Sequence, residues 1–342
     1  MIKQELGQFY TTRYEYILSG MEIPNNVKTI IEPFVGKGDL LKFILNKEKY
    51  ILEIYDIDPQ IENTIKQDTL SNPPCYSNKF VLTNPPYLAK NKGTDKRLYQ
   101  KYECDDLYKC FILSLIENEC LGGIIIIPLN FLCSIRKRDI NLRKSFIEKY
   151  RITKINIFEE KVFDDTSYTV CSMCFTKNIK KINDDVIDID IYPSLKKMRV
   201  CLNSQNNYSI GGEIYKTPQN TKIKVSRATR HTKENITNIL LKCIDDNMKS
   251  QLGFKLVGDN ERFIDKTENL SARSYATLVL NIELTLEEQK ELVGKMNNYI
   301  KENRKKYNSL FLTNYRESNT IARKRISFDL AFRICNMMIV SV

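Results

Sequence analysis

The run Gly122–Pro128, GGIIIIP, constrains the fold more than any other part of the chain. Four consecutive isoleucines leave no polar face, so this segment is expected to be a strand that is buried on both sides. Further strand-like runs occur at 29–34, 50–58 and 79–84, and they alternate with helical patterns at 39–46 and, most clearly, at 105–118. This alternation predicts an α/β domain in which helices cover both faces of a mostly parallel sheet.

The composition changes near residue 178, where the chain turns polar and loses aromatic residues. We therefore expect two domains, 1–178 and 179–342, the second a smaller unit of mixed α+β structure with a helix around 286–307. The formal net charge of +11 is unevenly distributed, because residues 1–177 carry +2 and residues 178–342 carry +9. The second half is therefore the part expected to bind a polyanionic partner.

The cellular location, and whether a metal site is expected, can be judged from the cysteines, the single histidine and the apolar segments. The ten cysteines are scattered and no secretory leader is recognisable, so a reducing, cytoplasmic location is expected. The longest aliphatic run, Ile124–Ile127, is too short to span a membrane. The CxxC pair of Cys171 and Cys174 has no second pair, and His231 is the only histidine. We therefore expect no metal site and no catalysis that depends on histidine.

Two strand ends indicate a nucleotide pocket. The segment Glu32–Gly38, EPFVGKG, follows one predicted strand, and its glycines allow the backbone to approach a ligand closely. It has two glycines, so it is not the three-glycine dinucleotide motif. The next strand ends at Asp56-Ile57, where a carboxylate can accept hydrogen bonds from ribose hydroxyls. Asp68 is a candidate acceptor for an adenine amino group. An ordinary turn at 32–38 and a solvated loop acid at Asp68 are the alternatives.

The segment Asn84-Pro85-Pro86-Tyr87 carries the candidate chemistry. It follows the apolar run Phe80–Leu82, and two prolines at that point end a strand and remove two backbone donors. The Asn84 side-chain oxygen and the Pro85 carbonyl then become acceptors for a planar amine, with the Tyr87 ring beside them. The segment Asn72–Cys75 repeats Asn-Pro-Pro without a preceding strand or a following ring, so it predicts only a loop.

Together these motifs resemble the S-adenosylmethionine-dependent, adenine-specific DNA methyltransferases of restriction-modification systems. Asn84–Tyr87 matches their catalytic motif, Asp/Asn-Pro-Pro-Tyr/Phe, and Glu32–Gly38 matches their cofactor motif, an acidic residue followed by Pro-x-x-Gly-x-Gly. Gly7–Thr12, GQFYTT, is similar to their N-terminal motif, although that motif usually ends in Thr-Pro, so Thr12 departs from it. The motif order resembles the gamma arrangement, and the resemblance covers roughly residues 5–178. It implies a Rossmann-like, seven-stranded sheet.

The resemblance also implies roles for individual residues. S-adenosylmethionine would be held by Tyr10, Thr11, Thr12, Glu32, Pro33, Phe34, Gly36, Gly38, Asp56, Ile57, Asp68 and Asn84. Catalysis would depend on Asn84, Pro85, Pro86, Tyr87 and Phe175. In this scheme Tyr87 and Phe175 pack against an adenine that has been flipped out of double-stranded DNA. The acceptors draw the adenine amine toward tetrahedral geometry, so that its lone pair attacks the methyl group without a metal.

Two basic runs in the second half are expected to contact DNA phosphates. No acidic residue occurs between Glu213 and Glu234, and Ile321–Phe328 adds a cluster of three basic residues. The expected contacts are Lys222, Lys224, Arg227, Arg230, Arg323, Lys324 and Arg325. A solvated charged face is the alternative.

Partners and rival functions follow from the resemblance. It implies double-stranded DNA as a partner, and it makes a cognate restriction endonuclease acting on the same site a candidate partner. Monomer and homodimer both remain open. An RNA adenine methyltransferase shares the chemistry, and a protein-glutamine methyltransferase also uses Asn-Pro-Pro-Tyr, although it typically has a more glycine-rich cofactor loop and no large basic domain. A catalytically idle DNA-binding subunit is the non-enzymatic alternative, and the intact tetrad argues against it.

Overall fold

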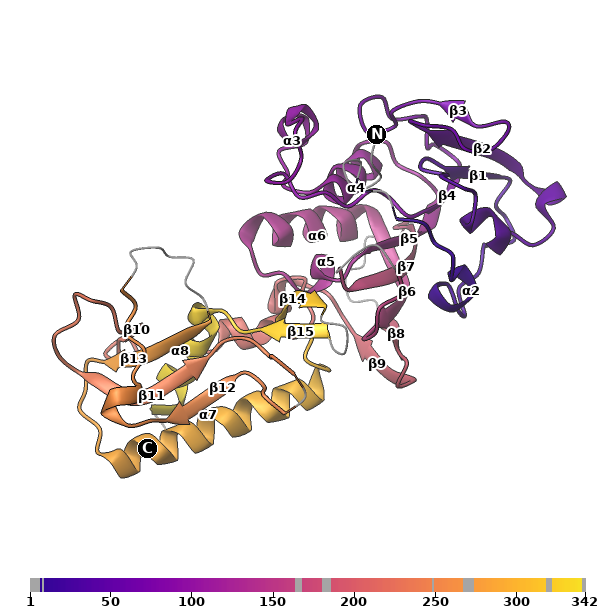
Figure 1. Cartoon of the computed structure of the whole chain (residues 1–342). Helices are drawn as coiled ribbons and strands as arrows, with labels where there is room; N and C mark the ends of the chain where they lie inside the picture. The colour runs from indigo at the N-terminus through magenta and orange to yellow at the C-terminus, as the bar shows by residue number, and fades with distance from the viewer. Residues whose placement is uncertain are drawn as a thin grey trace. The chain divides into compact units, whose positions relative to one another are not determined.

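The computed structural model describes residues 7, 9–163, 168–179, 186–247, 249–266, 274–317 and 322–339, with the backbone alone for 314–317, 322 and 323. The chain forms two compact units, Met1–Asn203 and Ser204–Val342 (Figure 1). The division thus falls 25 residues later than the predicted boundary after residue 178. The first unit keeps a small net charge of +3, and the second carries +8.

The first unit is built on a nine-stranded sheet with the order β3-β2-β1-β4-β5-β7-β6-β8-β9 (Figure 1). The five strands from β1 to β5 are parallel to one another. The strand β7 is antiparallel to both of its neighbours, β5 and β6. The strands are β1 (Thr29–Glu32), β2 (Ile51–Asp56), β3 (Ile65–Lys66), β4 (Phe80–Thr83), β5 (Gly122–Pro128), β6 (Tyr150–Phe158), β7 (Val170–Lys177), β8 (Ile187–Tyr192) and β9 (Lys196–Val200).

The prediction of seven strands is corrected to nine by the segment after residue 185. β8 pairs in parallel with β6, and β9 pairs with β8, so both strands extend the sheet of the first unit. The sequence of β8 is IDIDIY, in which Ile187, Ile189 and Ile191 are buried. The aspartates that alternate with them gave the segment its polar composition. A strand with one buried face was therefore mistaken for the start of a second domain.

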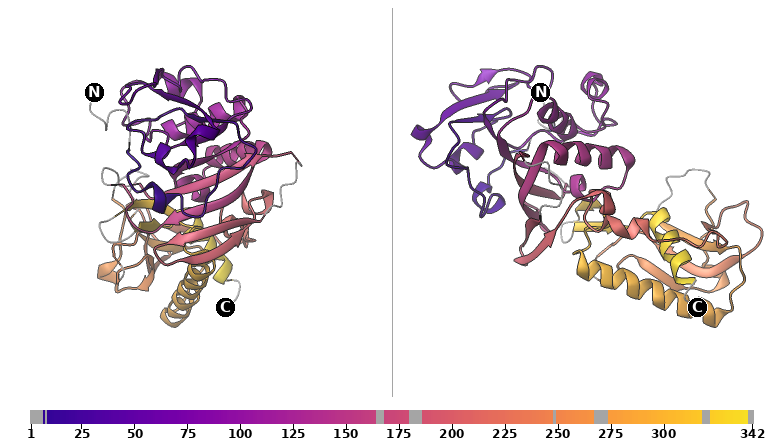
Figure 2. Two further views of the ribbon diagram at one scale, coloured as in Figure 1. Left: turned by 90° about the vertical axis from the view of Figure 1, so that its right-hand side faces the viewer. Right: turned by 180° about the vertical axis from the view of Figure 1, so that it is seen from behind.

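Helices cover both faces of this sheet. The side chains of Ser172 and Phe175 point to opposite faces of β7, because residues an odd number apart on a strand alternate. Ser172 donates to the carbonyl of Ile17 at 2.6 Å, whereas the Phe175 ring packs against Phe146 at 5.1 Å. The helices of this unit are α2 (Tyr14–Ile17), α3 (Arg97–Lys101), α4 (Leu107–Glu117), α5 (Asn130–Cys133) and α6 (Lys137–Lys149). The helices α4 and α6 pack side by side (Figure 2).

One predicted helix is much shorter than expected. The pattern at 39–46 indicated a helix after the glycine turn, but only the 3-10 helices η1 (Leu40–Phe43) and η2 (Lys47–Lys49) form there. Asn46 adopts a left-handed conformation (φ 52°) and separates the two short turns. The glycine turn is therefore not followed by a helix long enough to supply a strong terminal dipole.

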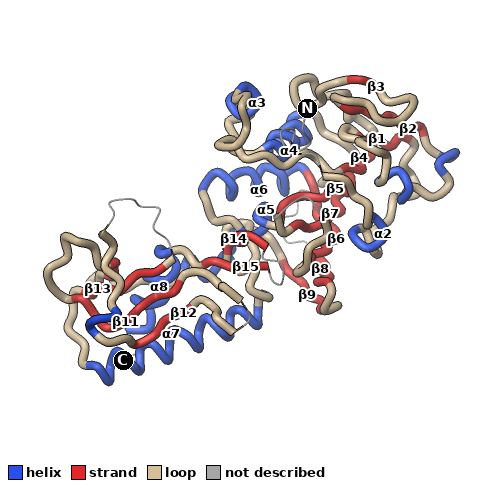
Figure 3. The backbone as a smooth tube through the Cα atoms, in the orientation of Figure 1, coloured by secondary structure: helices blue, strands red, loops and turns tan. Residues whose placement is uncertain are grey.

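The second unit combines an antiparallel sheet with two helices (Figure 3). Its sheet has the order β10-β13-β11-β12, and a separate hairpin pairs β14 with β15. The elements are η3 (Ser204–Asn206), η4 (Gly212–Lys216), β10 (Val225–Arg227), β11 (Ile236–Lys242), β12 (Gly253–Leu256), η5 (Asp259–Glu261), β13 (Tyr275–Leu280), α7 (Leu286–Lys306), β14 (Thr313–Glu317), β15 (Ala322–Arg325) and α8 (Phe328–Ile339). Among the described residues, no helix has the length and apolar character needed to cross a membrane.

The long helix α7 has clear causes in the sequence. Thr285 and Glu288 form a reciprocal capping box, in which Glu288 N–H donates to the threonine hydroxyl at 3.2 Å and Thr285 N–H donates to the glutamate at 2.7 Å. Leu292, Met296 and Ile300 recur every four residues and form its buried stripe. The helix packs against β11 and β12. Its predicted extent, 286–307, agrees with the observed one to within a residue.

Candidate active site

The strand order places the candidate site at a topological switch point. β1 and β4 are neighbours in the sheet. After β1 the chain continues to β2 on one side of this pair, and after β4 it continues to β5 on the other side. In open α/β sheets the carboxyl ends of such strands leave a crevice between their loops, where ligands bind. The predicted motifs Glu32–Gly38, Asp56-Ile57 and Asn84–Tyr87 follow β1, β2 and β4 respectively.

A cavity of about 430 Å³ lies at this edge of the sheet. Its volume is in the range of sites for small organic ligands. Nine of the predicted site residues line it, namely Tyr10, Thr11, Phe34, Gly36, Asp56, Ile57, Asp68, Asn84 and Pro86. The structure therefore brings together segments that are more than 70 positions apart in the sequence, around one cavity that is partly open to solvent.

Asp56 organises the turn after β1. Its carboxylate is almost fully buried and accepts hydrogen bonds from the N–H of Gly36 at 2.8 Å and of Asp58 at 2.9 Å. Gly36 has a left-handed conformation (φ 51°), and a Cβ at this position would lie 3.1 Å from the Tyr10 ring. Glycine is therefore required here both by the backbone conformation and by the close approach of Tyr10.

Glu32 lies beneath the cavity rather than in its wall. One carboxylate oxygen accepts from Phe34 N–H at 3.0 Å and from the Thr83 hydroxyl, which joins the end of β1 to the end of β4. The other oxygen is buried without a hydrogen-bond partner among the described residues. Burial raises the pKa of Glu32 to about 8. Its role in the structure is to connect two strand ends, and the expectation that it lines the pocket is corrected accordingly.

The Asn84 amide is held at the end of β4 by the N-terminal segment. Its Nδ2 donates to the carbonyl of Phe9 at 2.8 Å and to the Thr11 hydroxyl at 3.1 Å. The Tyr87 hydroxyl lies within hydrogen-bond distance of both Asn84 Oδ1 and the carbonyl of Ile126, the latter at 2.7 Å, and its single proton serves one of these acceptors at a time. Because a carbonyl oxygen has two lone pairs, Oδ1 retains one site for a further donor.

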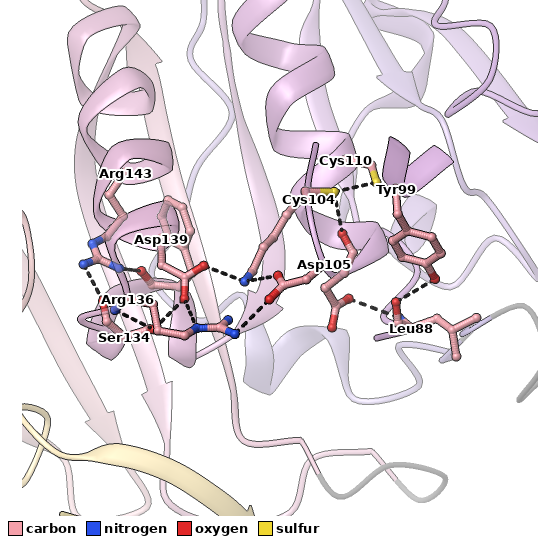
Figure 4. Close-up of polar contacts among 12 residues, drawn as sticks. Leu88, Tyr99, Cys104, Asp105, Cys110, Ser134, Arg136, Asp139 and Arg143 are labelled. Carbon is pink, nitrogen blue, oxygen red and sulfur yellow. Dashed lines mark hydrogen bonds and ion pairs between the residues drawn. The ribbon is translucent and has the colours of Figure 1, made fainter. Parts of the chain in front are cut away.

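The loop after the tetrad is anchored to helices α3 and α4 (Figure 4). Leu88 N–H donates to Asp106 Oδ1 at 3.1 Å, and the Leu88 carbonyl accepts from the Tyr99 hydroxyl at 2.9 Å. Burial raises the pKa of Asp106 to about 7. Leu88 and Tyr99 both line the cavity, so these bonds fix one of its walls.

A buried ion-pair network supports this wall by joining α4 to α6 (Figure 4). Lys109 lies 2.7 Å from Asp105 and 2.6 Å from Asp139, and Arg136 contacts the same two carboxylates at 2.8 Å each. The side chains of Lys109 and Asp139 are 5% and 4% exposed. Each of the four charges has two partners of opposite sign, so each keeps a counter-ion if one of the other residues is replaced. The network thus fixes the start of α4, where Leu107 reaches the cavity.

Several predicted site residues do not line the cavity. Thr12 is exposed, because the chain turns away after Thr11. Pro33 is buried, and its carbonyl accepts a hydrogen bond from the Thr69 hydroxyl. Gly38 packs against Ile61, because a Cβ atom at position 38 would lie 3.0 Å from that side chain. Pro85 and Tyr87 are buried beside the cavity and outside its lining.

Phe175 is corrected most clearly. It is fully buried in β7, and its ring packs against Phe146 at 5.1 Å and Tyr150 at 5.0 Å. These are core contacts on the α6 face of the sheet, so Phe175 cannot pack against a base at Asn84. Two other aromatic rings from this part of the chain lie near the tetrad, namely Tyr168, which contacts Tyr87, and Phe163, which contacts Phe9.

Sequence reasoning missed part of the cavity wall. Phe9 lies within the segment Gly7–Thr12 that resembles the N-terminal motif, but no role was predicted for it. Leu107, at the start of α4, belongs to the segment Asp106–Tyr108, which resembles a further motif of the same methyltransferases at a helix that flanks the pocket. The other missed residues are Val35, Lys37, Asp39, Leu40, Gln67, Thr69, Leu70, Leu88, Gly93, Thr94, Asp95, Leu98 and Tyr99. Those from Leu88 onward come from a loop and from α3, and no motif in the sequence marked them.

The predicted DNA-contacting residues have different environments in the second unit. Lys222, Lys224 and Arg230 are exposed. Arg227 is largely buried, pairs with Asp265 at 2.9 Å and lies over the Phe328 ring. Lys324 is also buried, at 5% exposure, Arg325 is half-buried, and the side chain of Arg323 lies outside the described part of the structure. The expectation of phosphate contacts therefore rests mainly on the three exposed residues.

Comparison with known families agrees with this arrangement of strands and motifs. The profile of the family described as N-6 DNA Methylase matches residues 49–277, which is about two thirds of the chain. The chain belongs to the N-6 DNA methylase family. No curated protein matches its sequence.

Three solved structures are examples of those that resemble part of this chain. The type I methyltransferase subunit from Streptococcus thermophilus is 17% identical, with a TM-score of 0.40 over 54% of this chain and 47% of that one. The M protein of the type I enzyme EcoKI is 14% identical, with a TM-score of 0.38 over 61% and 53%. The type IIG restriction endonuclease BpuSI is 14% identical, with a TM-score of 0.40 over 67% and 36%. The chain spans about half, or less, of the length of these proteins.

Proposed function

We propose that the chain is an S-adenosylmethionine-dependent DNA methyltransferase that acts on the exocyclic amine of adenine. The observation that carries the proposal is the Asn84 amide. It lies at the carboxyl end of β4, it lines a cavity of cofactor size, and its oxygen keeps one acceptor site. Membership of the N-6 DNA methylase family supports the same reaction.

The cavity residues fit S-adenosylmethionine. The turn at Gly36 has no side chain to obstruct a ligand, and the Asp56 carboxylate adjoins it. Ile57, Leu70 and Leu98 provide apolar surface for an adenine ring. The wall also contains the carboxylate of Asp68, which favours a cationic ligand, whereas Asp39 already pairs with Lys42 at 2.8 Å and Lys37 lies over the Tyr10 ring at 5.0 Å.

Replacing Asp56 by alanine is expected to weaken cofactor binding by about ten- to a hundredfold. The change removes the acceptor for the ribose and leaves the Gly36 and Asp58 N–H groups without their partner, and hydrogen bonds to charged groups are worth about 1.5–3 kcal/mol. Titration calorimetry with S-adenosylmethionine measures the change. Asp58→Ala is the matched control, because the Asp58 side chain is exposed and outside the cavity. Equal affinities for both variants would contradict the assignment of Asp56.

The residues around Asn84 are suited to activating an amine. The amine nitrogen of adenine is a weak nucleophile, since its lone pair is delocalised into the ring. Hydrogen bonds from its two N–H groups to Asn84 Oδ1 and the Pro85 carbonyl localise that lone pair. S-adenosylmethionine, when bound, supplies a methyl group on a sulfonium, so that the N–C bond forms as the C–S bond breaks and one amine proton leaves. Tyr87 holds the acceptor oxygen of Asn84 in position.

The exposed cations of the second unit are proposed to contact DNA phosphates. Each phosphate contact contributes about 0.9 to the slope of the logarithm of affinity against the logarithm of salt concentration. The triple substitution Lys222→Ala, Lys224→Ala and Arg230→Ala is therefore expected to reduce this slope by about 2 to 3. Fluorescence anisotropy with duplex DNA at several salt concentrations measures it. Lys290→Ala, on exposed α7 surface where Lys290 pairs with Glu287, is the control. An unchanged slope in the triple variant would remove these residues from the interface.

The proposed substrate class is tested by offering alternatives in parallel. The purified chain is incubated with S-adenosylmethionine labelled in the methyl group and with unmethylated duplex DNA, RNA of the same sequence, or a mixture of unmodified proteins. Label is expected in the DNA only. Label in the RNA or the protein fraction instead would favour the rival methyltransferases, and label in none would favour a catalytically idle subunit.

A further inference from the structure

Phe9 lies between two other aromatic side chains next to the cavity. Its ring stacks on Tyr87 with centroids 5.4 Å apart and planes inclined by 27°. It also contacts Phe163, with centroids 6.4 Å apart and planes inclined by 39°. Within the described part of the chain, Tyr87 and Phe163 make no ring contact with each other. Phe9 therefore occupies a slot that these two rings border.

The other sides of the Tyr87 ring are covered by the protein. The residue is 2% exposed, and its hydroxyl is bonded inward to the carbonyl of Ile126. Tyr108 and Tyr168 pack against it edge-on, at centroid distances of 6.3 and 6.0 Å. A planar group that stacks on Tyr87 must therefore take the place of the Phe9 ring.

The backbone around Phe9 is fixed, whereas its ring is held only by packing. The Gly7 carbonyl accepts from Tyr87 N–H at 2.9 Å, and the Phe9 carbonyl accepts from Asn84 Nδ2 at 2.8 Å. Rotation of the phenylalanine side chain to another rotamer moves the ring while both bonds remain intact. Neither backbone bond therefore prevents the ring from leaving the slot.

We propose that Phe9 is a placeholder for the target base. Its ring occupies the position on Tyr87 where the flipped base stacks, and it turns away when the base enters. This inference rests on the proposed function of the Asn84 site. A base stacked on an aromatic ring is held at least as well as a second aromatic side chain, and adenine adds hydrogen bonds to Asn84 and Pro85. An extruded adenine therefore displaces Phe9, whereas in its absence Phe9 keeps the slot filled.

A tryptophan at position 9 reports this exchange directly. The chain contains no tryptophan, so Phe9→Trp places a single indole in the slot. The variant is saturated with sinefungin, a non-transferring analogue of S-adenosylmethionine, and its emission and quenching by acrylamide are measured with and without long unmethylated duplex DNA. We expect protected, short-wavelength emission from the free protein. With DNA, the emission should shift to longer wavelength and become quenchable. Leu45→Trp, at a position that is 79% exposed, gives the exposed reference and should not respond.

A second pair of variants tests the same idea through affinity. If the ring competes with the base, Phe9→Ala should bind DNA about two- to tenfold more tightly in the presence of sinefungin, which is the range that one aromatic contact supports. Phe9→Tyr, which restores a ring, should return to the wild-type affinity. A purely structural role predicts the opposite, namely weaker binding of both sinefungin and DNA by Phe9→Ala, and that result would overturn the proposal.

Failure of this inference is distinguishable from failure of the proposed function. If the wild-type chain methylates DNA but the indole of the Phe9→Trp variant stays protected in the DNA complex, Phe9 is no placeholder and the proposed function stands. If the wild-type chain transfers no methyl group to DNA, the proposed function fails, and the placeholder role fails with it.

Discussion

Replacing Asn84 by alanine is expected to lower the catalytic rate by about a hundred- to a thousandfold. The substitution removes the acceptor that is proposed to polarise the adenine amine, and one preorganised polar contact of this kind is worth roughly 3–4 kcal/mol in the transition state. Single-turnover transfer of a labelled methyl group to DNA measures the rate. The loss should appear in kcat more than in the binding of either ligand.

Cofactor affinity should change much less. Asn84 also donates to the Phe9 carbonyl and the Thr11 hydroxyl, so its removal loosens the N-terminal segment that lines the cavity. Neutral hydrogen bonds of this type contribute about 0.5–1.5 kcal/mol, which limits the loss of affinity to about tenfold. Asn72→Ala is the matched control, because Asn72 begins the other Asn-Pro-Pro segment and is exposed outside the cavity. Wild-type turnover by Asn84→Ala, or equal damage from both substitutions, would show that the tetrad is only a strand-ending turn.

The stability of the protein is expected to fall as the pH rises from about 4.5 to about 8, in part because of Glu32. Burial raises the pKa of Glu32 to about 8, whereas the ordinary pKa of a free glutamate is 4.5. Between these pH values the folded state binds a proton that the unfolded state has released, so folding becomes less favourable as the pH rises. Each pKa unit corresponds to about 1.36 kcal/mol, and the full effect is on the order of 5 kcal/mol.

Glu32→Gln should remove this dependence. Glutamine keeps an oxygen that can accept from Phe34 N–H and the Thr83 hydroxyl, but it cannot ionise. The free energy of unfolding is measured with urea at about pH 5.5 and about pH 8.5, an interval that contains most of this transition. Between these two pH values, the wild-type protein should lose more stability than Glu32→Gln does. Glu62→Gln, at an exposed position, should follow the wild type. Parallel curves for wild type and Glu32→Gln would mean that Glu32 is ionised in the folded protein throughout this range.

The location of the candidate site in the fold could be predicted, because its polar residues lie at the ends of predicted strands. Asp56 and Asn84 each follow a short apolar run, and parallel strands bring their carboxyl ends to one edge of the sheet. The sequence therefore predicts that these residues meet, and the structure brings them together around one cavity. The buried strand at Gly122–Pro128 was also predicted correctly, since four isoleucines permit no exposed face.

The errors have physical causes of their own. Phe175 was assigned to the site because of its position in a motif, but the alternation of side chains along β7 turns it toward α6. The acidic alternation in β8 resembled a linker, because composition does not distinguish a half-exposed strand from a loop. The wall formed by Gly93, Thr94 and Leu98 could not be predicted from local pattern, since only tertiary packing brings it to the cavity.

The most direct test of the proposed reaction identifies the modified nucleoside. Unmethylated duplex DNA is incubated with the full chain and S-adenosylmethionine, digested to nucleosides and analysed by mass spectrometry, with Asn84→Ala protein in parallel. The wild-type chain is expected to produce N6-methyladenine, and the variant roughly a hundredfold less, or lower still, under single-turnover conditions. Methylation of cytosine, or equal N6-methyladenine from both proteins, would contradict it.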